Sequence, residues 1–228
     1  MRPGLDGYWM PPFLTSEYDP PGGAANVLHA DADLLAVEKP AGLLSVPGKG
    51  PALADCLIAR LERDFPGVLL VHRLDRDTSG VMVFARTAHA QRHLGLQFEK
   101  RQTSKSYVAR VEGLVAEKRG HIDLPLCVDW DRRPRQHVNH EKGRAAQTNW
   151  EVEDRGSDET RMRLRPVTGR SHQLRVHMLS LGHPILGDTL YADGPARDWP
   201  RMMLHAEILE LRHPTGGRAM RFEAPAPF

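Results

Sequence analysis

Short apolar runs separated by turn residues dominate the first half of the chain. Leu34 to Val37 is one such run, and Val68 to Val71 and Val81 to Phe84 flank a strongly charged segment. Runs this short, bounded by Gly, Pro or polar residues, are typical of buried strands. They predict that the charged stretch from Val71 to Gly80 contains a loop mounted rigidly between two core strands, which suits reactive groups, although a salt-bridged hairpin turn would look the same.

Three stretches have the spacing of helices. Apolar residues recur at helical intervals from Leu53 to Phe65, and a second helix is predicted over His89 to Arg101. Ser171 is a plausible N-cap for a third helix that ends at Leu181 before Gly182. These helices do not alternate regularly with the predicted strands, which favours an α+β fold.

The third predicted helix is apolar nearly all round, which is typical of a buried helix, yet Arg175 lies in its middle. A buried guanidinium keeps its charge and needs an anionic partner. The charged loop offers two carboxylates, Asp75 and Asp77. The alternative is that Arg175 extends along the helix and reaches solvent.

Strict alternation marks the strands of the second half. In Ser104 to Val111, Lys105 and Tyr107 share one face, so an amine lies beside a phenol ring. In Arg161 to Val167, three arginines alternate with apolar residues and project from one face. Further strands are expected at 121–128, 146–152, 202–206, 208–211 and 218–223.

Length and composition fit a single large domain or two small ones. With 228 residues, 40% of them hydrophobic, the chain can bury a sizeable core. Residues 1–25 hold five prolines and four glycines and are predicted to be a flexible arm, with an ordered domain over 26–228. We expect a cytoplasmic protein, since there is no signal peptide, no membrane-length apolar run and only two cysteines.

Basic residues are clustered although the net charge is only +2. Residues 161–175 contain five arginines and no acid, and residues 99–110 contain four basic residues against one acid. Such clusters are an electrostatic footprint for nucleic acid, although a solvated protein face would look the same. Twelve histidines are present, but no metal-binding spacing accompanies them, so no metal is expected.

Four motifs together resemble the RluA family of pseudouridine synthases. They are VHRLDRDTSG from Val71, KSYVARV from Lys105, TGRSHQLRVHMLSLGHPILGDTLY from Thr168, and Leu204-His205-Ala206. The match runs in order from about Asn26 to the C-terminus. The resemblance implies the pseudouridine synthase catalytic fold, with a mixed, largely antiparallel sheet flanked by helices around a central RNA-binding cleft.

Within that family, LLSVPGKG, LPLCVDWDRRPRQ and the short length resemble the dual-specificity subgroup. That likeness implies action on a tRNA anticodon stem-loop and on a stem-loop of 23S rRNA, by a monomer without cofactor or metal. Many members carry an N-terminal S4-type RNA-binding domain, whereas this chain has only the Pro/Gly arm.

The resemblance also assigns roles to individual residues. It implies that Asp75 is the catalytic carboxylate, that Arg175 keeps it ionised, and that Tyr107 stacks on the uracil and helps to remove its C5 proton. Arg73 would fill the space left by a flipped base or grip the flanking backbone. Contacts to RNA phosphates are expected from the remaining candidates: His72, Lys105, Arg170 and the row formed by Arg161, Arg163 and Arg165.

Two other functions compete with this one. Asp75-Arg76-Asp77-Thr78 after an apolar strand also matches the start of haloacid-dehalogenase-like phosphatases, which use an Asp nucleophile and magnesium. That class needs a Rossmann-like alternation, which is missing, and a later acidic pair, for which only Asp129 and Asp131 are near. A non-catalytic RNA-binding module would explain the arginine clusters, but would leave Asp75, Tyr107 and Arg175 without a joint purpose.

Overall fold

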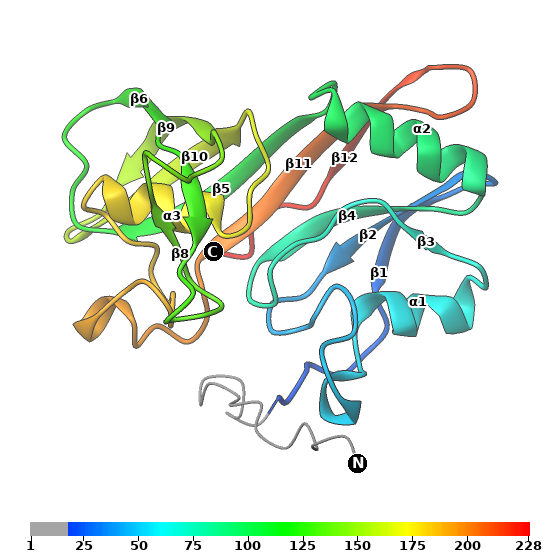
Figure 1. The fold of residues 1–228 in the computed structure, drawn as a ribbon, viewed down its shortest axis with the longest axis horizontal. Helices are drawn as coiled ribbons and strands as arrows, with labels where there is room; N and C mark the ends of the chain where they lie inside the picture. Colours follow the sequence, from blue (N-terminus) through cyan, green and yellow to red (C-terminus); the bar gives the residue numbers. More distant parts are fainter. Residues whose placement is uncertain (1–17) are drawn as a thin grey trace, which may run out of the picture.

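A computed structural model describes residues 18–228, which form one large sheet with helices on both faces (Figure 1). The strands of this sheet follow the order β1-β2-β4-β11-β5-β10-β9-β6, with β3 beside β4 and β12 beside β11. Their bounds are β1 (Asn26–Ala30), β2 (Leu34–Lys39), β3 (Leu69–Leu70), β4 (Ser79–Ala85), β5 (Ser104–Glu112), β6 (Arg119–Asp123), β9 (Gln147–Arg155), β10 (Glu159–Pro166), β11 (Leu204–Arg212) and β12 (Ala219–Glu223).

The remaining elements lie on or beside this sheet. A separate hairpin joins β7 (Leu126–Val128) to β8 (Gln136–Val138). The helices are α1 (Leu57–Asp64), α2 (Ala88–Glu99) and α3 (Gln173–Ser180), with 3-10 turns η2 (Pro51–Leu53) and η3 (Gly194–Ala196). The predicted α+β class and largely antiparallel sheet are confirmed. No helix within residues 18–228 is long and apolar enough to cross a membrane.

The centre of the sheet is a short parallel seam between β4 and β11. His205 pairs with Ser79 and Ala206 with Gly80, and this is the one parallel pairing among the strands of residues 18–228. Gly80 has φ +115°, and a Cβ there would lie 2.2 Å from the carbonyl oxygen of Ala206. Only glycine allows this approach, which fixes the end of the 72–79 loop against the middle of the sheet.

Strand β2 is covered on both faces, which explains the continuous apolar run at Leu34 to Val37. Leu34 and Ala36 pack towards α2 and β12, whereas Leu35 and Val37 pack towards α1. A strand covered on both faces loses the apolar–polar alternation, so its sequence is a continuous apolar run. In the other half, α3 packs Leu174 against the core that includes strands β5 and β10.

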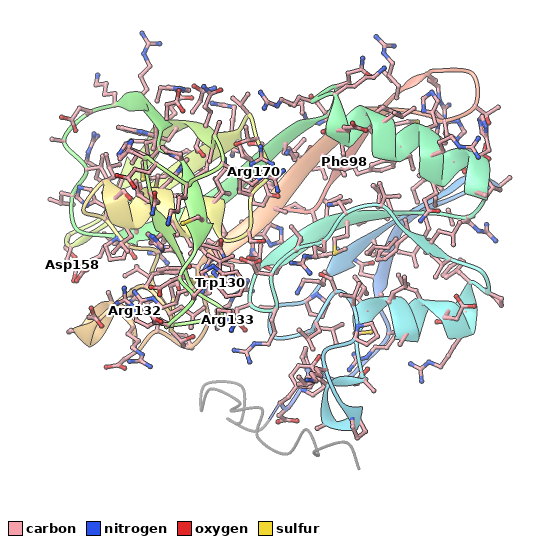
Figure 2. The ribbon with its side chains drawn as sticks, viewed as in Figure 1. Phe98, Trp130, Arg132, Arg133, Asp158 and Arg170 are labelled. Atoms are coloured by element: carbon pink, nitrogen blue, oxygen red, sulfur yellow. The ribbon has the colours of Figure 1, made fainter. Side chains whose placement is uncertain are left out.

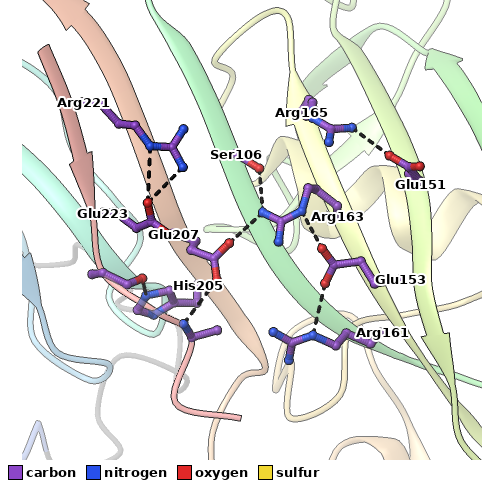
Figure 3. Close-up of polar contacts among 12 residues, drawn as sticks. Ser106, Glu151, Glu153, Arg161, Arg163, Arg165, His205, Glu207, Arg221 and Glu223 are labelled. Atoms are coloured by element: carbon purple, nitrogen blue, oxygen red, sulfur yellow. Dashed lines mark hydrogen bonds and ion pairs between the residues drawn. The ribbon is translucent and has the colours of Figure 1, made fainter.

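The arginine row of β10 lies on the opposite face of the sheet from Tyr107 and is already paired with carboxylates (Figure 3). Arg161 and Arg163 both donate to Glu153 on β9, and Arg163 also donates to Glu207 on β11. Arg165 pairs with Glu151. The predicted alternation is confirmed. Acids on β9 and β11 already pair with these guanidinium groups, which leaves the groups less available to the phosphates expected to bind them.

Several predicted boundaries were wrong. Helix α1 begins at Leu57, because Pro51 to Leu53 form a separate 3-10 turn. The residue that caps α3 is His172 and not Ser171. The two strands predicted at 202–206 and 208–211 are one strand, β11, with a bulge between Ala206 and Ile208. The flexible arm predicted for residues 1–25 lies mostly outside the described residues.

Candidate active site

A cleft of about 580 Å³ opens at the seam, between α2 on one side and the connection from β10 to α3 on the other. Phe98 and Arg170, labelled in Figure 2, line it from these two sides. All seven residues predicted for the site line this cleft: Asp75, Tyr107, Arg175, Arg73, His72, Lys105 and Arg170. The fold therefore brings these seven residues, which lie between positions 72 and 175 of the chain, together in one cleft.

Asp75 lies on the loop between β3 and β4, and that loop is anchored on both sides of it. Ser45 Oγ donates to the carbonyl of Leu74 at 2.7 Å and accepts from its amide at 3.2 Å. The fully buried Lys39 ammonium donates to three carbonyls, among them that of Arg76 at 2.8 Å. Burial lowers the pKa of Lys39 to about 7. The backbone flanking Asp75 is thus held in place, while its side chain stays 29% exposed to the cleft.

Asp77, the other carboxylate of the loop, is not in the cleft lining. It pairs with the adjacent Arg76 at 2.8 and 3.1 Å. Asp75 and Asp77 could not be distinguished by charge alone, and the pairing of Asp77 with Arg76 outside the cleft favours a structural role for Asp77.

Arg175 is buried as predicted, with a side chain that is 3% exposed, so the solvent-reaching alternative is wrong. Its Nη1 lies 3.3 Å from Asp75 Oδ2, which confirms the predicted contact. Its main partner, however, is Asp188, which accepts from Nε and Nη2 at 2.7 Å each. Hydrogen bonds and the negative charge of Asp188 outweigh burial and raise the pKa of Arg175.

Sequence reasoning missed Asp188. This residue is fully buried and also accepts from the amides of Leu190 and Tyr191. The one available signal was its position as a lone acid in the apolar stretch ILGDTLY, since a buried carboxylate also needs a partner. Arg175 is therefore fixed by Asp188 and offers its remaining nitrogen to Asp75.

Tyr107 lies half-buried in the cleft wall formed by β5. Burial and the negative charge of Asp75 both raise the pKa of Tyr107. The phenol therefore keeps its proton at neutral pH, which suits a ring that stacks on a base better than it suits a proton acceptor.

His72 has a different environment from the one expected for a phosphate contact. Its ring stacks on Phe98 at 4.6 Å, and its Nε2 accepts from the amide of Val83 at 3.1 Å. Burial lowers the pKa of His72 to about 3, helped by the positive charge of Lys105. The ring is therefore neutral and already accepts a hydrogen bond from a neighbouring strand, so it offers no positive charge to a phosphate.

Cationic groups surround the mouth of the cleft. Arg73 is exposed there, and Arg101 and Arg144 join the predicted Lys105 and Arg170. Burial and the positive charges of Arg144 and Arg101 lower the pKa of Arg170. Like charges held close together are stabilised by an anion, and a phosphate would supply it. Arg101 lies in the basic cluster of residues 99–110, but neither Arg101 nor Arg144 was predicted from the sequence as a site residue.

Comparisons with known proteins agree with this geometry. A family profile described as RNA pseudouridylate synthase matches residues 33–180. The chain is 50% identical over 204 residues to the "Dual-specificity RNA pseudouridine synthase RluA" of Escherichia coli K12, covering 89% of this chain and 93% of that protein. A protein of the same name from Vibrio vulnificus is 50% identical over 205 residues, covering 87% of this chain and 82% of its own length.

A solved structure shows the same fold. "Human RNA Pseudouridylate Synthase Domain Containing 1" superposes with a TM-score of 0.77 at 30% identity. The superposition covers 92% of this chain and 87% of the human one.

Proposed function

This chain belongs to the RNA pseudouridylate synthase family, and from that premise we propose that Asp75 is the carboxylate with which it isomerises uridine in two kinds of RNA. The two proposed substrates are a tRNA anticodon stem-loop and a stem-loop of 23S rRNA. The observation that carries the proposal is the Asp75–Arg175 contact at 3.3 Å in an open cleft with a cationic mouth. The name of the Escherichia coli relative, which includes dual specificity, supports two RNA substrates.

The isomerisation breaks the bond from ribose C1′ to uracil N1 and joins C5 to C1′, after which C5 loses its proton to solvent and N1 gains one. Asp75 acts at C1′, either as a nucleophile or by directing the sugar through a glycal path. Arg175 Nη1, 3.3 Å from Oδ2 of that carboxylate, holds the carboxylate in place, and the Tyr107 ring stacks on the uracil. The reaction imports no group and changes no oxidation state, so the proposed mechanism uses no cofactor.

The target base must first leave its stack, which costs a few kcal/mol. Arg73, exposed at the cleft mouth, is placed to fill the vacated space or to hold the flanking backbone. Lys105, Arg170, Arg101 and Arg144 bind the phosphates on either side. These four contacts contribute affinity that decreases with salt.

The connection between β7 and β8 provides a further RNA contact outside the cleft. Its Trp130 is 69% exposed, and the Arg133 guanidinium lies 4.5 Å from the ring centroid (Figure 2). An exposed aromatic ring beside a cation is a suitable platform for an unpaired base of a stem-loop.

Release of tritium from RNA labelled at uridine C5 tests the proposal. The wild-type protein is expected to release tritium from both a tRNA transcript and a 23S rRNA fragment, without added metal. Asp75→Asn abolishes release, whereas the isosteric control Asp77→Asn retains most of it, because Asp77 pairs with Arg76 outside the cleft. Full activity of Asp75→Asn would contradict the catalytic assignment, and release from one RNA alone would contradict dual specificity.

We also propose that residues 26–228 work as one catalytic domain, in monomeric form and in the cytoplasm. Cys56 and Cys127 are free thiols, in keeping with a reducing compartment. A mass of 25.6 kDa in sedimentation equilibrium would agree with a monomer, whereas twice that value would contradict it. The phosphatase alternative is not favoured, since relatives over most of the chain are RNA-modifying synthases.

A further inference from the structure

His172 occupies an unusual position next to Asp75. It precedes helix α3 with φ +54°, a left-handed conformation that few residues other than glycine adopt. Its Nε2 lies 3.9 Å from Asp75 Oδ2, and its Nδ1 lies 2.8 Å from the hydroxyl of Tyr191. A strained backbone that places a side chain in a cleft is a reason to look for a function of that side chain.

Hydrogen-bond partners determine which ring nitrogen carries the proton. The amide of Gln136 donates to the Tyr191 oxygen at 2.7 Å, so that oxygen already acts as an acceptor there. The other partner of the Tyr191 hydroxyl in the described structure is His172 Nδ1, which therefore receives the hydroxyl proton. Burial lowers the pKa of His172, so the ring is neutral and its single proton lies on Nε2.

The two oxygens of Asp75 differ in their surroundings. Arg175 Nη1 and His172 Nε2 both approach Oδ2, at 3.3 and 3.9 Å. Among residues 18–228, no hydrogen bond or ion pair to Oδ1 is found. Oδ2 is therefore approached from two directions, whereas Oδ1 remains available to a ligand in the cleft.

We propose that His172 is a positioning residue, which directs a neutral Nε2–H at one oxygen of Asp75 so that the other oxygen faces the ribose, and that Tyr191 fixes the required tautomer. This inference rests on the proposed catalytic role of Asp75. At 3.9 Å the N–H acts as an oriented dipole rather than as a formed hydrogen bond. A neutral donor orients the carboxylate without adding a second full positive charge, which would stabilise the ionised ground state and slow its reaction.

The tautomer can be measured without turnover. In protein labelled with ¹⁵N-histidine, the ring signals of His172 are identified by their loss in His172→Gln. The wild-type protein is expected to show an Nε2–H, Nδ1-acceptor ring, and Tyr191→Phe is expected to shift it towards a mixture of tautomers. An Nδ1–H ring in the wild-type protein would overturn the inference.

Turnover distinguishes positioning of Asp75 from a purely structural role. A Gln side chain can still direct an N–H at Asp75, whereas Asn tolerates the left-handed backbone better but is too short to reach. We expect kcat for tritium release to fall by about 10-fold or more in His172→Asn and by clearly less in His172→Gln, with KM nearly unchanged. If Asn retains more activity than Gln, the backbone conformation is what matters and the inference fails.

Matched controls separate these effects from general damage. Tyr18→Phe removes a phenol that, like Tyr191, has two hydrogen-bond partners, here Leu44 N and Asp55 O, but that lies outside the cleft. His89→Gln changes an exposed histidine on α2. Both controls are expected to keep wild-type kcat, whereas Tyr191→Phe lowers it several-fold, and an unchanged kcat in Tyr191→Phe would overturn the inference. Loss of all release in the wild-type protein would instead contradict the proposed function, while the tautomer measurement would still stand.

Discussion

Replacing Asp188 by Asn should separate the stability of the site from its chemistry. The Arg175 and Asp188 side chains are 3% and 0% exposed, so water screens neither of their two 2.7 Å hydrogen bonds. Removing one partner of such a buried pair costs about 3–5 kcal/mol, because the remaining charge is left uncompensated. Asn keeps the volume and one acceptor oxygen for the amides of Leu190 and Tyr191, so we expect a loss near the lower limit, about 3 kcal/mol.

Urea unfolding measures this loss. At about 2 kcal/mol/M for the denaturant dependence, the midpoint should move down by about 1.5 M. Most domains have about 5–15 kcal/mol of stability, so Asp188→Asn should remain folded at low urea. Its tritium release should fall at least about 10-fold, because Arg175 is no longer held in the orientation that reaches Asp75.

A double variant provides the decisive comparison. Arg175→Met combined with Asp188→Asn removes both charges and keeps an acceptor oxygen for the amides of Leu190 and Tyr191, so stability should return to within about 1 kcal/mol of the wild-type protein. Activity should stay lost, because nothing then contacts Asp75 from α3. An Asp188→Asn protein as stable as the wild type would refute the buried-pair reasoning, and wild-type release by the double variant would refute the need for Arg175.

Three further predictions concern the seam, the histidine of the loop and the cleft mouth. Gly80→Ala should lower the unfolding free energy by about 3 kcal/mol or more, because its Cβ would lie 2.2 Å from the Ala206 carbonyl oxygen. The control Gly95→Ala on α2, with open space around it, should be neutral or stabilising, and equal effects of the two substitutions would contradict the seam argument. Because the pKa of His72 in the folded protein is about 3, only the unfolded chain binds a proton at His72 between pH 6.5 and 3. The unfolding free energy should therefore fall by up to about 1.4 kcal/mol for each pH unit from 6.5 down to 3. Denaturant titrations of His72→Gln at several pH values should lack this part of the pH dependence. Arg144→Gln or Arg170→Gln should reduce the salt dependence of RNA binding by about one phosphate contact, measured by fluorescence anisotropy, whereas Arg165→Gln on the opposite face should leave it unchanged.

The sequence best predicted the features that depend only on a residue and on the helix or strand that contains it. Arg175 was expected to be buried because the helix around it is apolar, and the structure confirms both its burial and its contact with Asp75. Lys105 and Tyr107 were placed on one strand face by alternation, and both line the cleft. Such patterns are local and need no knowledge of strand order.

Features that depend on strand register or on isolated residues were not predictable in the same way. The row from Arg161 to Arg165 is visible in the sequence, but one of the acids that pair with it, Glu207, comes from β11, which lies on the far side of β5 and is brought near only by the sheet order. Asp188 and Tyr191 lie in a connection without periodicity, so no pattern linked them to Arg175 or to His172. The cap of α3 was misplaced by one residue because a histidine in a left-handed conformation has no sequence signature.

Because the loop that carries Asp75 helps to enclose Lys39, chemical modification of this lysine reports whether the loop is closed. The chain has six lysines, and the ammonium of Lys39 is fully enclosed by the carbonyls of Pro40, Leu43 and Arg76. An amine-reactive reagent can therefore modify it only when the loop separates from β2, because the closed loop leaves Lys39 no access to solvent. The rate at which this one lysine acquires a mass label, relative to exposed lysines, would report how often the loop opens and whether bound RNA keeps it closed.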